Sequence, residues 1–341
     1  KWIGDIKYRE GGNNLLPLLK DPYMRARFFA AEALGRIMYE PAINGIIELL
    51  NSNNDEDVYL RHAGSLALAR IGKADPIIAL SKNPSRAVRI AAVVALRRMS
   101  HPGIAAFLDD TDEFVVTETA RAINDDLSIK DALPALGNVL KTTKFTNEAL
   151  LRRAINANLR VGTDEALQNL VDYAKKQDCP AAMRAEAIAA LSTWAKPSVV
   201  DRVDGRYRGV IERDPAKVRS QAGATLVELL NSSDASVRTS AVKAVNKLGI
   251  TEASAKLLTL LKSDPQADVR VEALKAMASI QDHRMDEAIK MAMTDKEKNV
   301  RITAISLIDK LNIPKQLMAD LLSDVIRTKT MEEKQEEEEG R

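Results

Sequence analysis

Residues 263–280 read SDPQADVRVEALKAMASI and contain the pattern that decides the fold. Apolar residues lie one position before Arg270 and three, seven and ten positions after it. They are Val269, Ala273, Met277 and Ile280. This spacing lines one face of an α-helix, whereas the faces of a strand alternate every two residues. The stretch is therefore predicted to be a helix that follows an Asp-Pro turn.

The same pattern returns along the chain at intervals of about 27 to 36 residues, with an arginine at the anchor position. The anchors are Arg27, Arg61, Arg89, Arg152, Arg184, Arg238, Arg270 and Arg301, and Val116 stands where a ninth arginine would be. A second apolar run precedes each anchored helix, as Leu257–Leu261 precedes Arg270. Neither helix can bury its apolar stripe alone, so successive helix pairs must stack. We call the anchored helices the marked helices.

A residue that can cap a helix lies six positions before each anchor. It is an aspartate at Asp21, Asp55, Asp110, Asp178, Asp264 and Asp295, and Asn83, Thr146 and Ser232 fill the other three places. Six residues turn a helix by about 600°, which leaves the two side chains about 120° apart. Each arginine is therefore expected to bond the turn of a neighbouring repeat. Val116 and the acidic pair Asp125-Asp126 predict an interruption at the fourth repeat.

The Asp-Pro turns, the Asp-to-Arg spacing and the helix end Ala33-Leu34-Gly35 resemble HEAT repeats. The resemblance covers about Leu15 to Asp324. It implies an all-α fold, a right-handed α-α superhelix or HEAT/armadillo-like solenoid of about nine helix pairs, whose marked helices line the concave face. It also implies an inter-repeat ladder. The expected ladder residues are Asp21, Arg27, Asp55, Arg61, Arg89, Asp178, Arg184, Arg238, Asp264, Arg270, Asp295 and Arg301.

Four segments carry a narrower resemblance: Arg27–Gly35, Tyr59–Gly64, Ala91–Arg98 and Asp201–Arg208. They are similar to the HEAT segment of large secreted bacterial proteins that also carry a propeller resembling sugar dehydrogenases and a c-type cytochrome module. That resemblance implies a membrane-bound dehydrogenase-like context and a periplasmic or cell-envelope location. The first residue is Lys1, which suggests a piece of a longer protein. No Cys-x-x-Cys-His motif occurs, so this segment is not expected to attach haem.

Residues 1–330 are predicted to form a single solenoid, and the acidic residues 331–341 a disordered tail. An insertion is expected near residues 197–213, because 54 residues separate Arg184 from Arg238. Its candidate partner-binding residues are Arg202, Arg206, Tyr207, Arg208 and Arg213, which could hold an anion or an acidic patch of another protein. The alternative is a loop strapped over the repeats by local salt bridges.

No constellation in the sequence predicts catalysis, a cofactor or a metal. Cys179 is the single cysteine, which excludes an internal disulfide, and the three histidines His62, His101 and His283 are far apart. Asn51, Asn53, Asp55 and Asp57 have the spacing of a calcium loop. However, Glu56 and His62 stand where that loop needs glycine and the bidentate glutamate. We therefore predict a protein without enzymatic activity.

The predicted function is a protein-binding scaffold, whose partners are flanking domains of the same polypeptide or another protein. The alternative is a nucleic-acid-binding enzyme that resembles DNA glycosylases of HEAT-like fold, which use a basic concave groove. Arg97, Arg98, Arg121, Lys243, Lys247 and Lys275 are interleaved with Glu32, Glu118 and Glu272, and the net charge is only +2. This mixture argues against a nucleic-acid groove. No apolar run is long enough to predict a membrane span.

Overall fold

The computed structural model of the chain describes residues 1–308, 310–311, 316–324 and 326–327. The predicted acidic tail, residues 331–341, lies outside the described residues. Within them the regular structure is helical apart from one isolated antiparallel bridge between Val200 and Tyr207. The helices pack in pairs, so the all-α solenoid predicted from the sequence is confirmed.

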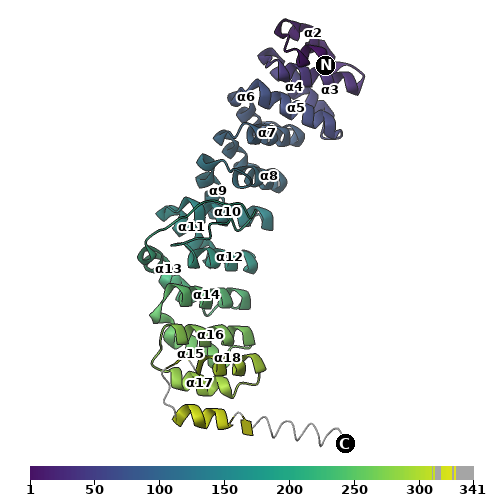
Figure 1. Cartoon of the computed structure of the whole chain (residues 1–341). Coiled ribbons are helices and arrows are strands. Elements are labelled where there is room, and N and C mark those ends of the chain that lie inside the picture. The colour runs from purple at the N-terminus through teal and green to yellow at the C-terminus, as the bar shows by residue number, and fades with distance from the viewer. Residues whose placement is uncertain (309, 312–315, 325, 328–341) are drawn as a thin grey trace, which may run out of the picture. The chain divides into compact units, whose positions relative to one another are not determined.

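Nine marked helices occur within residues 1–308 (Figure 1). They are α3 (Met24–Arg36), α5 (Val58–Ile71), α7 (Arg86–Arg98), α8 (Glu113–Asn124), α10 (Glu148–Val161), α12 (Ala181–Ser192), α14 (Ala235–Leu248), α16 (Ala267–Ser279) and α18 (Lys298–Ile308). Within each of the two compact units described below, marked helices that follow one another pack together, as α3 does with α5 and α14 with α16.

The first helices of the pairs are less uniform. Six pairs are opened by α2 (Gly12–Leu15), α4 (Ile43–Asn53), α9 (Leu133–Thr142), α11 (Asp164–Lys175), α13 (Pro215–Leu229) and α15 (Ser254–Ser263), and α17 (Met285–Met293) opens the last. Some of these first helices are preceded by short helices, namely α1 (Trp2–Asp5), η1 (Arg9–Gly11), η3 (Glu40–Ala42), η6 (Lys130–Ala132) and η7 (Thr251–Ala253).

Three first helices are wholly or partly 3₁₀ where the sequence predicted ordinary helix pairs. They are η2 (Leu16–Lys20), α6 (Ala74–Ile78) with η4 (Ala79–Lys82), and η5 (Pro102–Asp109). The repeats that contain η4 and η5 are the shortest, with 28 residues from Arg61 to Arg89 and 27 from Arg89 to Val116. A 3₁₀ helix rises about 2.0 Å per residue against about 1.5 Å for an α-helix, so it spans the same length with fewer residues.

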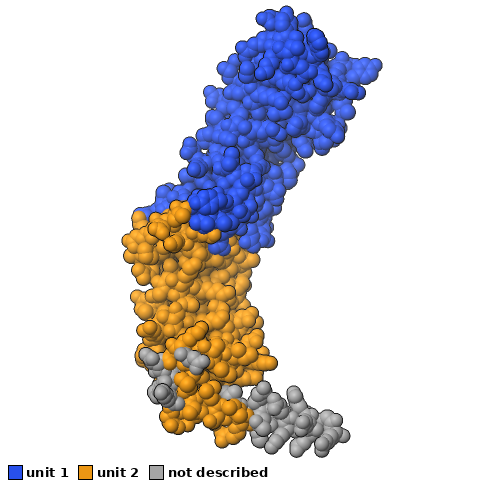
Figure 2. Space-filling model, in the orientation of Figure 1, with its two compact units in different colours: residues 1–169, 199–209 blue, residues 170–198, 210–341 orange. Residues whose placement is uncertain are grey.

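The chain divides into two compact units (Figure 2). Unit 1 contains residues 1–169 and 199–209, and unit 2 contains residues 170–198 and 210–341. The single solenoid predicted for residues 1–330 stays a prediction.

The core of each unit is made of the apolar stripes read from the sequence. In unit 2, Val269, Ala273 and Met277 of α16 are fully buried, and in unit 1 so are Val88 and Leu96 of α7. Aliphatic burial of this kind stabilises the stack by about 25 cal/mol per Å² removed from water.

The insertion is the longest stretch between helices, because α12 ends at Ser192 and α13 begins at Pro215. Its part in unit 1 is a small hairpin. The Asp201 N–H donates to the Arg206 carbonyl (2.8 Å) and the Arg208 N–H donates to the Val199 carbonyl (2.7 Å). Gly205 at the turn has φ +72°, which a side chain would disfavour.

Candidate functional site

The turns before the marked helices differ from the prediction in one respect. The ladder aspartates do not cap the helices directly. Asp264 accepts the Gln266 N–H (2.9 Å) and Asp295 accepts the Glu297 N–H (2.8 Å), so each closes a turn just before its marked helix. The capping residue itself comes two positions later, as Asp57 does for α5, where it accepts the Leu60 N–H (2.8 Å).

In unit 2 the arginines join adjacent repeats. Arg238 donates to both carboxylate oxygens of Asp264 (2.7 and 3.1 Å) and to the Ser232 carbonyl of its own turn (2.8 Å). Arg270 likewise donates to both oxygens of Asp295 (2.7 and 2.8 Å) and to the Asp264 carbonyl (2.7 Å). Burial alone would raise the pKa of Asp295, but its hydrogen bonds, first among them that from Arg270, hold it below its usual value.

Among the other expected ladder arginines, Arg89 links adjacent repeats in the same way, whereas Arg27 and Arg301 bond their own turns. Arg89 pairs with Asp110 of the next turn (2.6 Å). Arg27 and Arg301 donate to the carbonyls of Asp21 (2.8 Å) and Asp295 (2.7 Å) of their own turns.

Arg61 departs from the expected bond to a neighbouring turn. Arg61 pairs with Asp55 in its own repeat (2.8 Å), although the sequence argument made that a poor pairing. The sequence argument assumed continuous helical geometry between the two residues, but Asn54 and Asp55 both adopt left-handed conformations (φ +43° and +64°), so that geometry does not apply. Arg184 donates to the Ala174 carbonyl (3.0 Å) and, across to the next repeat, to Asp234 in the turn before α14 (3.2 Å).

At the fourth repeat Val116 is fully buried in the arginine's place. Glu113 supplies a link instead, since one of its carboxylate oxygens accepts the N–H groups of Thr146 (3.0 Å) and Asn147 (2.8 Å) at the start of α10. In the next repeat the anchor assigned to Arg152 was off by one position. The cap of α10 is Asn147, so Leu151 occupies the anchor position and Arg152 pairs with Glu148 (2.7 Å).

The insertion residues separate into two groups. Arg208 is largely buried and donates to Asp201 (3.0 Å), Asp204 (2.7 Å) and the Asn124 carbonyl (3.0 Å), as the strap alternative predicted. Arg213, in unit 2, lies over the Trp194 ring (4.6 Å) and donates to the Trp194 carbonyl (2.8 Å). Arg202, Arg206 and Tyr207 are exposed.

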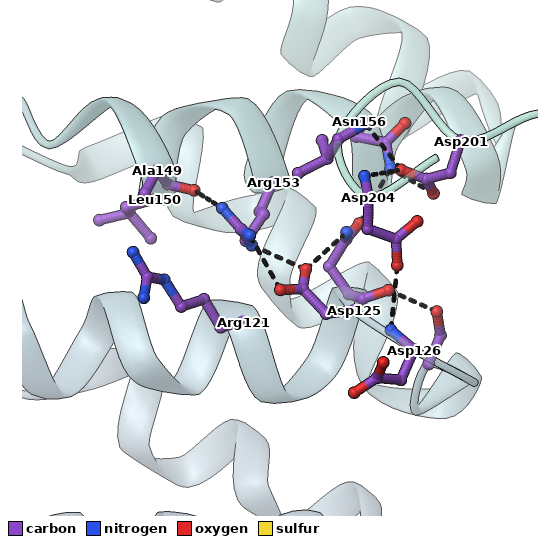
Figure 3. A network of polar contacts seen from close by, with 12 residues as sticks. Arg121, Asp125, Asp126, Ala149, Leu150, Arg153, Asn156, Asp201 and Asp204 are labelled. Atoms are coloured by element: carbon purple, nitrogen blue, oxygen red, sulfur yellow. Dashed lines mark hydrogen bonds and ion pairs between the residues drawn. The ribbon is translucent and has the colours of Figure 1, made fainter. Parts of the chain in front are cut away.

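A buried polar cluster under the hairpin was missed by the sequence reading (Figure 3). The Asn156 amide donates to Asn124 (2.9 Å) and to Asp201 (3.0 Å), and Arg153 holds both oxygens of Asp125 (2.8 Å each). Burial would raise the pKa of Asp201, but N–H donors from the backbone, Asn156 and Arg208 hold it below its usual value. The cluster could have been suspected from the sequence, because Asn124 and Asn156 interrupt the apolar stripes of α8 and α10.

A groove crosses the marked helices α5, α7 and α8 of unit 1. Its floor is apolar, with Ile90, Val93 and Ala122 nearly buried. Half-exposed Val58 and Phe114 also line it, and Arg86 lies over the Phe114 ring (4.8 Å).

Charged and polar groups complete the groove lining, namely Asp55, Arg61, His62, Arg97 and Glu118. The hydroxyl of Ser65, also in the lining, is buried and has no hydrogen-bond partner among the described residues.

The groups considered for metal chemistry are engaged elsewhere. Asn53 contacts the backbone of Asp57 (3.0 and 3.2 Å), and Asp55 pairs with Arg61. His101 caps η5 through the Gly103 N–H (3.0 Å). In the described part of the chain, no three histidine, cysteine or acidic side chains are placed to hold a metal, and no helix is long and apolar enough to cross a membrane.

These stacked helix pairs define an all-α repeat protein, and the comparisons with known proteins name the repeat. Residues 215–278 match the family of HEAT repeats, and residues 26–52 match the PBS lyase HEAT-like repeat. These two stretches therefore carry HEAT-type repeats. A search of curated proteins gave no match. The crystal structure of an engineered protein matches with 21% identity over 88% of this chain and 88% of that chain, with a TM-score of 0.44.

Proposed function

We propose that the chain is a non-catalytic scaffold that binds a protein partner on its marked helices. HEAT repeats are generally protein-binding modules, and the observation that supports a particular place is the groove across α5, α7 and α8. Exposed apolar side chains beside a buried apolar floor are what a partner's anchoring residue requires.

The lining of the groove supports a peptide or protein as the occupant. Val58 and Phe114 remain half-exposed, although α7 buries its own apolar stripe completely at neighbouring positions. The Ser65 hydroxyl offers a donor at the floor. A partner that inserts an apolar side chain would remove Phe114 from water, and a polar atom beside that side chain would satisfy Ser65.

The narrower form of the proposal concerns the partner. The proposed partner is a neighbouring domain of the same polypeptide. This is implied by the resemblance to the HEAT segment of secreted proteins that also carry dehydrogenase-like and cytochrome modules. The same resemblance makes the periplasm or cell envelope the proposed location.

The test is site-specific photo-crosslinking in the cells that make the protein. A benzophenone amino acid in place of Phe114 should capture one defined protein partner. The same group in place of Tyr8, which is equally exposed in unit 1 but outside the groove, should not capture it. Val94→Lys, which fills the groove from α7, should abolish the crosslink, whereas Val210→Lys at an exposed site should preserve it. Equal capture at Phe114 and Tyr8 would refute the groove as the docking site.

A DNA glycosylase-type activity has less support. Three of the six basic side chains considered for a nucleic-acid groove are paired with carboxylates, since Arg97 donates to Asp126 (2.8 Å), Arg121 pairs with Glu118 (3.3 Å) and Lys275 with Glu272 (3.2 Å). Strong binding to duplex DNA that weakens steeply with salt would favour that alternative.

A further inference from the structure

Arg27 differs from three other ladder arginines in what its guanidinium group binds. Arg89, Arg238 and Arg270 each donate from Nη1 to a carbonyl of their own turn, and from Nε and Nη2 to both carboxylate oxygens of an aspartate in the next repeat. The Nη1 of Arg27 likewise donates to the Asp21 carbonyl (2.8 Å). Its Nε and Nη2 have no hydrogen-bond partner among the residues that the structure describes. This repeat thus keeps free the pair of donors that binds a carboxylate in three others.

The aspartate expected to bind Arg27 is engaged elsewhere. Asp55 has φ +64°, whereas Asp110 and Asp264, which accept from the arginine of the preceding repeat, have φ −66° and −65°. In its left-handed conformation Asp55 places its carboxylate on Nη1 of Arg61 (2.8 Å), the atom that binds a backbone carbonyl in those three repeats. The ladder is therefore open between the first and second repeats.

Arg27 lines a cleft where η2, α3, α4 and the start of α5 meet, within unit 1. The floor of this cleft is apolar, because Leu19, Leu49 and Leu60 line it and are buried. Met24, which is 47% exposed, lines it as well. We call these four residues and Arg27 the Arg27 cleft. It shares no lining residue with the groove across α5, α7 and α8.

The other charged groups of the Arg27 cleft limit how acidic a ligand can be. Lys20 and Glu48 pair with each other (2.7 Å), and Asp57 is engaged as the cap of α5. Glu56 also lines the cleft and is exposed. Among these lining residues Arg27 is the cation without a carboxylate partner, so the cleft suits one carboxylate, and a strongly acidic segment would be repelled by Glu48 and Glu56.

We propose that the Arg27 cleft binds a protein segment in which one aspartate or glutamate stands beside a large apolar residue. The acidic side chain accepts from Nε and Nη2 of Arg27, as Asp110 does from Arg89, and the apolar residue covers Met24 and the leucine floor. An acidic side chain is favoured over a C-terminal carboxylate, because these donors hold aspartate side chains in three other repeats. The proposal rests on the scaffold function and adds a site outside the groove.

The probe is a phage-displayed library of random peptides, selected on the purified full chain and depleted on the Arg27→Lys variant. Lysine keeps the charge but cannot form the bidentate bond. We expect the recovered peptides to carry one Asp or Glu next to a large apolar residue. A recovered peptide, labelled with fluorescein, should bind Arg27→Lys about tenfold more weakly by fluorescence polarisation. Replacing its acid by Asn or Gln should weaken binding similarly, whereas amidation of its C-terminus should not.

The matched control is Arg25→Lys, because Arg25 is exposed on the same helix and does not line the cleft. This variant should bind the peptide like the wild type. Val94→Lys, which fills the groove, should bind it equally well.

A second variant closes the cleft without changing Arg27. Proline drives the residue before it toward the extended region, so Glu56→Pro removes the left-handed conformation of Asp55 and creates an Asp-Pro turn like Asp264-Pro265. The Asp55 carboxylate then binds Arg27, and the peptide should bind at least about tenfold more weakly. Glu56→Ala removes the same side chain without restricting Asp55, and it should bind the peptide no more weakly than the wild type.

Several outcomes would overturn the Arg27 cleft as a binding site. They are recovery of no peptide after depletion, unchanged affinity when the acid of the peptide is replaced, and unchanged affinity in Glu56→Pro. Loss of binding on amidation would assign the carboxylate to a C-terminus instead. Loss of binding in Val94→Lys would place the peptide in the groove. A missing crosslink at Phe114 would refute the groove alone, so the two sites fail separately.

Discussion

Two regions connect adjacent repeats through arginine and aspartate in different ways. Across α14, α16 and α18 of unit 2, Arg238 and Arg270 each bind the aspartate of the next repeat, about 26 residues away along the chain. Across α8 and α10 of unit 1, Val116 cannot make this bond. Arg208 of the hairpin binds the carbonyl of Asn124 at the end of α8 instead, and Asp201 of the hairpin accepts from Asn156 of α10. In these two regions charged groups link adjacent repeats, and the donor comes either from the repeat itself or from an insertion.

The two regions also differ in how many groups depend on one carboxylate. Asp264 serves one arginine and one backbone N–H. Asp201 serves Arg208, Asn156 and the N–H groups of Val203 and Asp204, and Arg160 lies 3.7 Å away. The loss of Asp201 should therefore leave more buried donors unpaired.

The largest expected effect is that of Asp201→Ala. It should lower the free energy of unfolding by about 4 kcal/mol, because Arg208, Asn156 and two backbone N–H groups would each lose a buried acceptor at once. Urea unfolding measures the loss, and hydrogen exchange should show faster exchange at the Arg208 amide. Asp131→Ala, at an exposed site in the same unit, should change stability by less than about 0.5 kcal/mol. A similar small effect for Asp201 would mean that the hairpin does not hold the region together.

Asp264→Ala should cost about 3 kcal/mol, since Arg238 would lose both of its carboxylate bonds in a nearly dry setting. Asp286, exposed on α17, provides the control, and its replacement by alanine should cost little. Thermal unfolding of both variants measures the two losses of stability. If Asp264→Ala and Asp286→Ala destabilise the protein equally, the Asp-to-Arg spacing does not contribute to stability.

A third link in unit 2 should appear as a dependence on pH. Burial would raise the pKa of Asp282, but the hydrogen bonds from Arg284 and Ser254 outweigh it and lower the pKa to about 2. The unfolded value is about 3.9, so Asp282 stabilises the fold above that pH by about 2 kcal/mol and loses this contribution as the pH falls toward 2. Asp282→Asn should therefore flatten the acid side of the stability curve, measured by urea unfolding at several pH values. Asp286→Asn should leave the curve unchanged; an unchanged curve for Asp282→Asn would show that this pair contributes nothing.

The smallest expected effect is that of Glu113→Ala, about 1 kcal/mol, because Glu113 accepts two N–H groups near the surface at the start of α10. Glu113→Gln should retain most of the stability, since its amide oxygen still accepts. Thermal unfolding would compare the two. Equal losses would mean that the carboxylate charge, and not the hydrogen bond, joins these repeats.

The sequence predicts the parts of this structure that depend on a regular period. Val269, Ala273 and Met277 recur at helical spacing, and burial of that face follows from geometry alone. The position of Arg270 beside Asp295 could be anticipated as well, because each repeat places the two groups at the same edge.

What the sequence does not reveal depends on contacts between distant segments or on small shifts of register. Nothing near Asn156 in the sequence indicates that Asp201, 45 residues later, would be its partner. Arg152 looked like an anchor because the repeat is one residue out of step, which the cap at Asn147 shows only in three dimensions. The groove was also not predicted: Val58 and Phe114 stand three and two positions before their anchors, off the apolar stripe, but a single apolar residue off the stripe is common on protein surfaces.

The hairpin's place in the chain has a consequence for folding during synthesis. Arg208 follows Asn124 by 84 residues, which ribosomes add in about 4 to 17 seconds. Throughout that time the carbonyls at the end of α8 lack their arginine, although α8 and α10 have already been made. Arg238 meets Asp264 after only 26 residues, or about 1 to 5 seconds. The fourth and fifth repeats are thus completed only after part of unit 2 has been synthesised, and a nascent chain that stops between residues 170 and 207 exposes their unfinished polar edge to chaperones and proteases.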